Sequence, residues 1–355
     1  MNVFNGLREF ISLLDGKGFL QHVQERVSWK YQLGEIARSS RSALLFENIE
    51  DYPGQKLFTN GLGRTASMAV CLNLEDNSSI AELAKAVIAG CAMPLQPVLL
   101  ANAPVKENIV SGDAVDLTEF PIPWWSRIDA GRFLGTWHLN ITRDPVTGER
   151  NIGVYRMQLL TANTAAVSFS PKSHLAQHLQ KAQELGQSLE MAVAIGVDER
   201  LIMAAAAAPP YGVDEYTLAG GLAQKPVELT QCLTVSNEVP AHSEIVIEGY
   251  IDPRTKVMEG PYLDYAGIPS CNPEARLFRA EAVMYRNGAI FRGTAVGRPG
   301  AEDHMLYSLL ANAKLADFHG SPVRQRLQNY LLRRGSFRLF QFTGRIHRIL
   351  RRGSM

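Results

Sequence analysis

The stretch Asn151-Ile-Gly-Val-Tyr-Arg156 decides how the middle of this chain folds. Apolar and polar residues alternate along it, a pattern typical of a half-buried β-strand. Side chains of a strand point alternately to its two faces, which here would carry Asn151, Gly153 and Tyr155 on one side and Ile152, Val154 and Arg156 on the other. The second face is unusual, because a guanidinium left unpaired among Ile and Val side chains is strongly unfavourable.

Two interpretations of Arg156 remain open on this segment alone. In the first, Arg156 stands at a strand end and its guanidinium reaches water. In the second, it is held at the rim of a ligand site, where a carboxylate or a phosphate is its partner.

The segments around this strand predict a β-rich middle region. Asp144–Gly148 reads as a turn, so 134–159 is expected to form a β-hairpin. The strands expected in this region cover 134–142, 151–159, 164–169, 191–196, 229–236, 243–250 and 279–294. Helices are expected near 174–185 and 198–207. This pattern favours a barrel-like or sandwich-like β core with inserted helices over a regular βαβ alternation.

The region before residue 95 has an α/β character. Helices are expected over 4–14 and 30–39, and a further helix should begin after Ser79, where Glu82 completes a capping box. Strands are expected over 19–26, 43–46 and 57–72. Five prolines between 93 and 125 indicate a boundary or a long connection.

Composition excludes several classes of protein. The 355 residues are 46% apolar and 20% charged, an ordinary balance for a globular protein, and the net charge of +1 gives no general electrostatic reason to bind nucleic acid. The four cysteines are scattered, which argues against a thiolate zinc site and against disulfides. The start of the chain does not resemble a signal peptide and no apolar run has transmembrane length, so we expect a cytoplasmic protein.

The end of the chain differs from the rest. From Lys314 onward it has ten basic residues and one acid, Asp317, so this tail carries about +9 and the remainder about −8. Such a tail could make peripheral contact with a membrane or nucleic acid, or it could be a solvated helical extension or an oligomer contact.

A few residues have side chains suited to chemistry. Glu259 and Asp264 flank a Gly-Pro pair that predicts a turn, and two nearby carboxylates can raise one pKa into the range of a proton donor. His174, His138 and His178 are candidate ligands, and Glu215 precedes small residues that allow close approach. An Asn, a His and a Glu together would suit Mn²⁺ or Mg²⁺. Solvated acids and structural histidines are the alternatives.

Several motifs in order resemble one known family. They are Phe120-Pro-Ile-Pro123, Asp129-Ala-Gly-Arg-Phe133, the run from Asn140 to Gln158, Ser243-Glu-Ile-Val-Ile-Glu-Gly249 and Glu259-Gly-Pro261. Together they resemble the UbiD-type decarboxylases, which use prenylated FMN, over roughly residues 4–305. The resemblance implies a mixed α/β fold: an N-terminal α/β region over 1–110, a split β-barrel-like flavin-binding domain over 111–305, and a basic, helical tail over 306–355. The C-terminal α/β domain usual in the family is expected to be missing.

The resemblance also implies roles for individual residues. Asn151, His174 and Glu215 match the ligands of a divalent metal, Mn²⁺ or Mg²⁺, that holds the flavin phosphate, and K⁺ often lies beside it in the family. The residues implied to line the cofactor are Val154, Tyr155, Arg156 and Ser173. Arg156, Glu259 and Asp264 match the catalytic Arg and carboxylates.

The activity implied is reversible, non-oxidative decarboxylation of an aromatic or α,β-unsaturated carboxylic acid. The expected partners are this acid, a flavin prenyltransferase that supplies the cofactor, and further copies of the chain in a homo-oligomer. The alternative is a non-catalytic prenylated-flavin-binding protein or an inactive subunit, which Leu263 favours because the family usually has Gly there.

Overall fold

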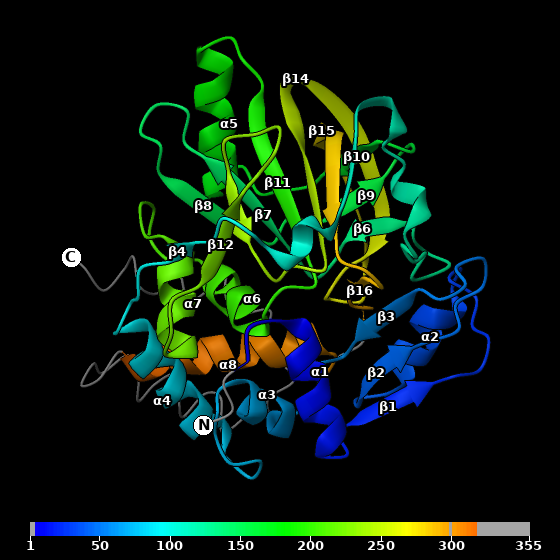
Figure 1. Cartoon of the computed structure of the whole chain (residues 1–355), viewed down its shortest axis with the longest axis vertical. Coiled ribbons are helices and arrows are strands. Elements are labelled where there is room, and N and C mark those ends of the chain that lie inside the picture. The colour runs from blue at the N-terminus through cyan, green and yellow to red at the C-terminus, as the bar shows by residue number, and fades with distance from the viewer. Residues whose placement is uncertain (1–3, 298–299, 318–355) are drawn as a thin grey trace.

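A four-stranded sheet forms in the first part of the chain (Figure 1). The computed structural model describes residues 4–297 and 300–317. The strands of this sheet, in spatial order, are β1 (Leu20–Val23), β2 (Ala43–Phe46), β3 (Lys56–Thr59) and β16 (Ile290–Arg292). β16 pairs in parallel with β3, so a segment far along the chain completes the N-terminal sheet.

Helices pack beside and below this sheet (Figure 1). They are α1 (Leu7–Gly16), α2 (Gln32–Ser39), α3 (Thr65–Cys71), α4 (Ile80–Cys91) and α8 (Glu302–Asp317). The capping box of α4 is present, with Ser79 and Glu82 bonded reciprocally. The strand expected over 57–72 is wrong beyond Thr59, because the residues after the break at Gly61 and Gly63 form α3. Most of α3 is buried, and periodicity alone cannot distinguish a short buried helix from a buried strand.

A curled nine-stranded antiparallel sheet forms the upper half of the molecule (Figure 1). Its main path runs β6 (Phe133–Gly135), β9 (Met157–Leu159), β10 (Thr164–Val167), β15 (Pro269–Tyr285), β14 (Ile245–Leu263), β11 (Leu189–Ile195), β7 (His138–Arg143) and β8 (Arg150–Gly153), and β5 (Asn108–Ser111) pairs with β15. The inserted helices are α5 (His174–Glu184), α6 (Glu199–Ala206) and α7 (Glu215–Ala223). The mixed α/β fold with a split barrel-like sheet is therefore confirmed.

Smaller elements connect these layers. A third sheet has the order β13 (Glu238–Pro240), β12 (Glu228–Gln231) and β4 (Val98–Leu99), and short 3₁₀ turns cover 104–107, 112–114 and 117–119. The domain boundaries at 110 and 305 stay a prediction.

The hairpin expected over 134–159 forms through β7 and β8, with Thr142 opposite Asn151. The single strand expected over 151–159 is wrong, because β8 ends at Gly153 and β9 begins at Met157. β8 and β9 lie near opposite edges of the curled sheet, so Val154–Arg156 crosses between them. The side-chain oxygen of Asn140 accepts the Tyr155 N–H at 2.9 Å and anchors this crossing. The expected strand 134–142 is divided in the same way, between β6 and β7.

The strand β14 runs well past the expected 243–250. The single strand expected over 279–294 is wrong, because β15 begins earlier, at Pro269, and ends at Tyr285, and 290–292 form the separate strand β16. Glu259 lies within β14, opposite Asn272, and the Gly260–Pro261 peptide is cis. The turn expected between Glu259 and Asp264 is therefore wrong, and the chain reverses after Leu263 instead. A proline can lie in a strand where the ladder is irregular, and the register of β14 shifts on both sides of Glu259.

A buried ion network joins β16 to the helices. Arg292 of β16 donates to Glu199 of α6 at 2.8 Å and to Glu302 of α8 at 2.6 and 3.0 Å. Trp137 donates its indole N–H to the second Glu199 oxygen at 2.7 Å. All three charged side chains are essentially inaccessible to water. This network fixes the first turn of α8 against β16 and α6.

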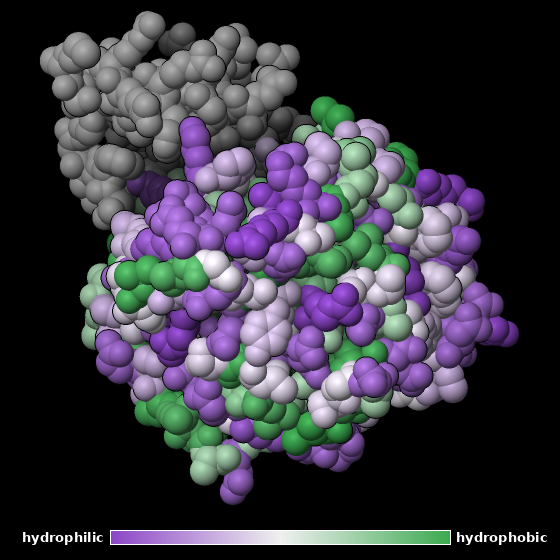
Figure 2. All heavy atoms as spheres, turned by 90° about the horizontal axis from the view of Figure 1, so that it is seen from above, coloured by the Kyte–Doolittle hydropathy of each residue, from purple (hydrophilic) through white to green (hydrophobic). Residues whose placement is uncertain are grey.

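The described residues give three further observations. No helix among residues 4–297 and 300–317 has the length and apolar character needed to cross a membrane. On the face seen in Figure 2, apolar residues form small groups between polar ones. The four cysteines form no disulfide, and the basic tail from residue 318 onward lies outside the described residues.

The contact between α7 and α4 yields a stability prediction. A Cβ atom at Gly221 would lie 2.1 Å from the carbonyl oxygen of Gly90 and 2.7 Å from that of Met93, and neither backbone can move freely. We expect Gly221→Ala to lower the free energy of unfolding by at least ~2 kcal/mol, as overpacking does elsewhere. The matched control is Gly16→Ala, where a Cβ atom meets nothing within 4 Å. Urea unfolding compares the two, and equal midpoints would contradict the prediction.

Candidate active site

Two adjacent cavities open beside the crossing segment Val154–Arg156. The first, of about 330 Å³, we call the Glu215 cavity, and the residues lining it include Asn151, Ser173, His174 and Glu215. The second, of about 210 Å³, we call the Arg156 cavity, and the residues lining it include Trp137, Arg156, Tyr262 and Asp264. Val154, Ala206 and Tyr307 line both, so the two cavities meet at these residues.

The Glu215 cavity brings together the three residues expected to bind a metal. Asn151 comes from β8, while His174 and Glu215 are the first residues of α5 and α7. Glu215 is 3% exposed, and its carboxylate accepts the Ile152 N–H at 3.0 Å. Burial raises the pKa of Glu215 to about 8 and lowers the pKa of His174. The buried amide nitrogen of Asn151 has no hydrogen-bond partner.

The surrounding structure holds these ligand candidates in place. Ser173 caps α5 by accepting the Ala176 N–H at 3.2 Å, and Asp214 caps α7. Arg150, next to Asn151, pairs with both Asp214 and Glu238 and so ties β8 to the start of α7. Two helix N-termini therefore begin at this cavity, and such termini favour anionic groups.

Arg156 has a defined partner in the second cavity. Its guanidinium donates to both carboxylate oxygens of Glu259 at 2.6 Å and lies 4.7 Å from the centre of the Tyr262 ring. The side chain of Arg156 is 22% exposed, whereas that of Glu259 is 0% exposed. The structure thus places a bidentate ion pair at the cavity wall, with the arginine toward the cavity and the glutamate behind it.

Asp264 also lines the Arg156 cavity, but separately from that pair. It follows the last residue of β14, and one carboxylate oxygen accepts the Ala266 N–H at 2.9 Å. Glu259 is not among the lining residues, so the cavity exposes one of the two carboxylates that the sequence singles out. The remaining candidates, Val154, Tyr155 and Ser173, line the Glu215 cavity.

The other two histidines considered as ligands lie elsewhere. His138 is fully buried in β7, and His178 is fully buried in α5, where its Nδ1 lies 3.0 Å from the Thr142 hydroxyl. Burial lowers the pKa of each to about 4, so both are neutral core residues.

Sequence reasoning missed several lining residues. Lys172 and Tyr307 line the Glu215 cavity, while Trp137 and Asp303 line the Arg156 cavity. The position of Lys172, just before a helix cap, could have indicated a phosphate contact. The contributions of α8, Asp303 and Tyr307, could not have been predicted, because they depend on packing between distant segments.

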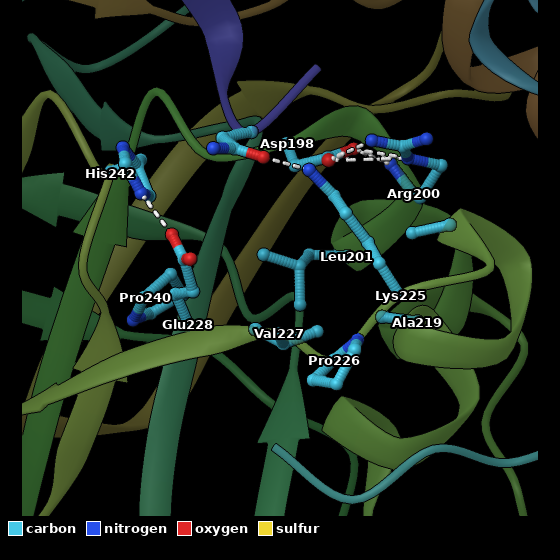
Figure 3. Close-up of a pocket in the computed structure, with 12 residues that line it drawn as sticks. Asp198, Arg200, Leu201, Ala219, Lys225, Pro226, Val227, Glu228, Pro240 and His242 are labelled. Carbon is cyan, nitrogen blue, oxygen red and sulfur yellow. Dashed lines mark hydrogen bonds and ion pairs between the residues drawn. The ribbon is translucent and has the colours of Figure 1, made fainter. Parts of the chain in front are cut away.

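A smaller pocket lies between α6, α7 and β12 (Figure 3). Its charged groups already have partners: Asp198 pairs with Arg200, Glu228 pairs with His242 at 2.6 Å, and Lys225 donates to the Phe4 carbonyl oxygen at 2.5 Å. Its volume of about 30 Å³ is close to that of one water molecule. We therefore assign it no ligand.

Asp129, from one of the sequence motifs, is a buried acid near the Arg156 cavity. It is 4% exposed; one carboxylate oxygen accepts the Leu263 N–H at 2.8 Å, and the other has no partner. Burial raises its pKa from 3.8 to about 6.

This shift predicts a pH-dependent stability. Below pH 4 both folded and unfolded chains hold the Asp129 proton, but between about pH 4 and 6 only the folded chain does. The Asp129 proton therefore contributes to the free energy of unfolding at low pH. That contribution, up to about 3 kcal/mol, is lost as the pH rises through 6. Asp129→Asn keeps an acceptor for Leu263 and cannot ionise. Urea unfolding from pH 4 to 8 should show the variant gaining stability relative to the unmodified chain, and a constant difference would contradict this assignment.

The sequence matches two family models. The 3-octaprenyl-4-hydroxybenzoate carboxy-lyase N-terminal domain matches residues 11–87, and the Rift-related domain of the same family matches 97–299. The chain therefore belongs to the UbiD family. A curated relative, an uncharacterized protein of Archaeoglobus fulgidus, is 34% identical in an alignment 325 residues long that covers 85% of this chain and 66% of that protein. The chain thus spans just under two thirds of that relative's length.

Solved structures of the same class are similar. The UbiD-class enzyme HmfF from Pelotomaculum thermopropionicum, in an evolved dimeric form with prFMN, is 30% identical with a TM-score of 0.82, over 88% of this chain and 72% of that one. Vanillic acid decarboxylase of Sedimentibacter hydroxybenzoicus is 25% identical with a TM-score of 0.85, over 89% and 69%. The 3,4-dihydroxybenzoic acid decarboxylase of Enterobacter cloacae is 25% identical with a TM-score of 0.81, over 89% and 69%.

Proposed function

We propose that this protein is a prenylated-FMN-dependent decarboxylase of a small aromatic or α,β-unsaturated carboxylic acid. The observation that carries the proposal is the Arg156–Glu259 pair, which presents a guanidinium to a cavity that meets the Glu215 cavity. An arginine in this position suits a substrate carboxylate, and the neighbouring cavity suits the phosphate end of a cofactor.

The donor set fits a divalent metal. Among the described residues no three His, Cys, Asp or Glu side chains form a metal cluster, but Asn151, His174 and Glu215 combine an amide, an imidazole and a carboxylate. Oxygen and imidazole donors suit Mn²⁺ or Mg²⁺. A bound cation would neutralise the buried Glu215 carboxylate, and the unpartnered amide nitrogen of Asn151 is a donor that suits an acceptor such as a phosphate oxygen. These three residues would hold the metal, and Lys172 with Ser173 would contact the flavin phosphate.

The cofactor, when bound, supplies a sink for the electron pair that remains when CO₂ leaves. Arg156 binds and orients the substrate carboxylate, and Glu259 holds the arginine in that orientation. Trp137 and Tyr262 exclude water around the substrate, which favours conversion of a charged carboxylate into neutral CO₂. Asp264 faces the cavity and is the residue that we assign to hold the proton delivered to carbon after CO₂ leaves.

The test begins with co-expression of the chain and a flavin prenyltransferase. Absorbance and mass spectrometry of the purified protein determine whether it retains prenylated FMN, and elemental analysis measures Mn and Mg. CO₂ release is then measured with a panel of aromatic and cinnamic-type acids. Bound flavin with CO₂ release supports the decarboxylase. Bound flavin without turnover of any acid would favour the alternative, a non-catalytic flavin-binding protein or an inactive subunit.

Other features remain predictions. These are the prenyltransferase as cofactor supplier, the homo-oligomer, K⁺ beside the metal, the cytoplasmic location and the membrane contact of the basic tail. Size-exclusion chromatography with light scattering would test the oligomer.

A further inference from the structure

The Arg156 cavity contains a second acid that the proposed mechanism does not use. Asp303 lies in the first turn of α8 and lines this cavity together with Arg156 and Asp264. Its neighbour Glu302 is held by Arg292 and by the N–H groups of Asn60 and Leu62 at 3.0 and 3.2 Å. The backbone that carries Asp303 is therefore fixed relative to the cavity.

One oxygen of Asp303 is paired and the other is not. Its Oδ1 lies 3.1 Å from Nδ1 of His304. Its Oδ2 is buried and has no hydrogen-bond partner, although the side chain is only 8% exposed. A buried carboxylate oxygen without a donor is unfavourable, and such atoms are rare unless a ligand or another group completes them.

The contact with His304 involves Oδ1 of Asp303 and leaves Oδ2 as an acceptor. Burial lowers the pKa of His304, but the hydrogen bond and charge of Asp303 and the backbone of Tyr265 raise it further, so the net shift is upward. With a proton on Nδ1, the His304 ring donates to Oδ1 of Asp303 and leaves Oδ2 as an acceptor. An ionised carboxylate can accept hydrogen bonds and cannot donate them.

We propose that Asp303 determines substrate specificity by accepting a hydrogen bond from a hydroxyl or ring N–H group of the substrate. The inference rests on the proposed function and narrows its substrate class to aromatic acids that carry such a donor.

The charges of the cavity set the orientation of such a substrate. Arg156 attracts the substrate carboxylate, so the carboxylate end is directed to Arg156. The donor group then faces the remaining acids. Trp137, Ile202 and Leu306 contribute flat and apolar surface, and a volume of about 210 Å³ suits a single substituted ring.

The test compares ligands that differ only in whether they carry a hydrogen-bond donor on the ring. Binding of 3- and 4-hydroxybenzoate and of 3- and 4-fluorobenzoate is measured by titration calorimetry on the co-expressed protein, because fluorine is no larger than hydroxyl and donates no hydrogen bond. We expect at least one hydroxy acid to bind about tenfold or more tightly than its fluoro counterpart, since a site built around a donor rejects analogues that lack it. Asp303→Ala should reduce this ratio to below about threefold.

Controls separate the possible outcomes. Asp303→Leu keeps about the size of the side chain and removes both acceptor oxygens, so it should also reduce the ratio. Asp113→Asn, at an exposed acid outside the cavity, should leave the ratio unchanged. Equal binding of hydroxy and fluoro acids by the unmodified protein would overturn the proposal, as would an undiminished ratio in a folded Asp303 variant. If the hydroxy acids bind more tightly than the fluoro acids but no CO₂ is released, the proposed activity is refuted and the role of Asp303 in binding stands.

Discussion

Arg156→Ala is expected to lower kcat/KM for decarboxylation by a factor of at least ~10³ while leaving flavin bound. The guanidinium is the cation that faces the substrate cavity from the crossing segment, and its loss removes a charge-assisted, bidentate partner for the substrate carboxylate. Arg156→Lys should also be strongly impaired, because an ammonium cannot bond both a substrate and Glu259 in the same planar arrangement. Steady-state CO₂ release measures the activity, and flavin absorbance measures retention of the cofactor.

The same substitution has a structural consequence that can be separated from catalysis. Without Arg156, Glu259 remains as a buried charge with no ionic partner, a change that typically costs about 3–5 kcal/mol. Adding Glu259→Gln to the Arg156→Ala variant should recover part of that stability and none of the activity. The exposed Arg254→Ala serves as the matched control and should change neither. Normal turnover by a folded Arg156→Ala variant would refute the assigned role.

The sequence predicts the local elements of this fold better than it predicts how these elements pack and connect. The Ser79 capping box and the β7–β8 hairpin depend on residues close in the chain, and both form as expected. The helix α3 was mistaken for a strand because its residues are buried on most sides. The crossing of Val154–Arg156 between sheet edges could not be predicted from alternation, since the pattern continues where the hydrogen-bonded ladder stops.

The same distinction between local sequence and long-range packing applies to the candidate site. The family motifs identify Asn151, His174 and Glu215, and the fold brings all three to one cavity. The motifs did not reveal that Glu259 is hidden behind Arg156, because its position depends on the long pairing of β14 with β15. The motifs also did not reveal Asp303, whose place in the cavity follows from a helix held by the Arg292 network. Contacts between segments far apart in sequence explain both omissions.

Glu215→Gln is expected to remove the divalent metal and most of the flavin from the purified protein. Glu215 is the one carboxylate among the described residues that line its cavity, so the substitution leaves only neutral donors, Asn151 and His174, for the cation. Without a carboxylate ligand we expect metal affinity to fall by a factor of at least ~10², and the flavin phosphate to lose the cation that would hold it. Elemental analysis and flavin absorbance after co-expression measure both losses, and Glu184→Gln, at an exposed position of α5, should cause neither.

The stability of the metal-free protein distinguishes a lost ligand from a failure to fold. Burial raises the pKa of Glu215 to about 8, so at pH 7 the metal-free carboxyl mostly carries its proton and is already neutral. Glutamine has nearly the same shape and retains an oxygen that can accept the Ile152 N–H. The metal-free variant should therefore be at least as stable at pH 7 as the metal-free unmodified chain, as measured by urea unfolding in the presence of a chelator. A variant that keeps its full complement of metal and flavin would exclude Glu215 as a ligand. A variant that loses them together with its folded state would show that the residue acts through the structure instead.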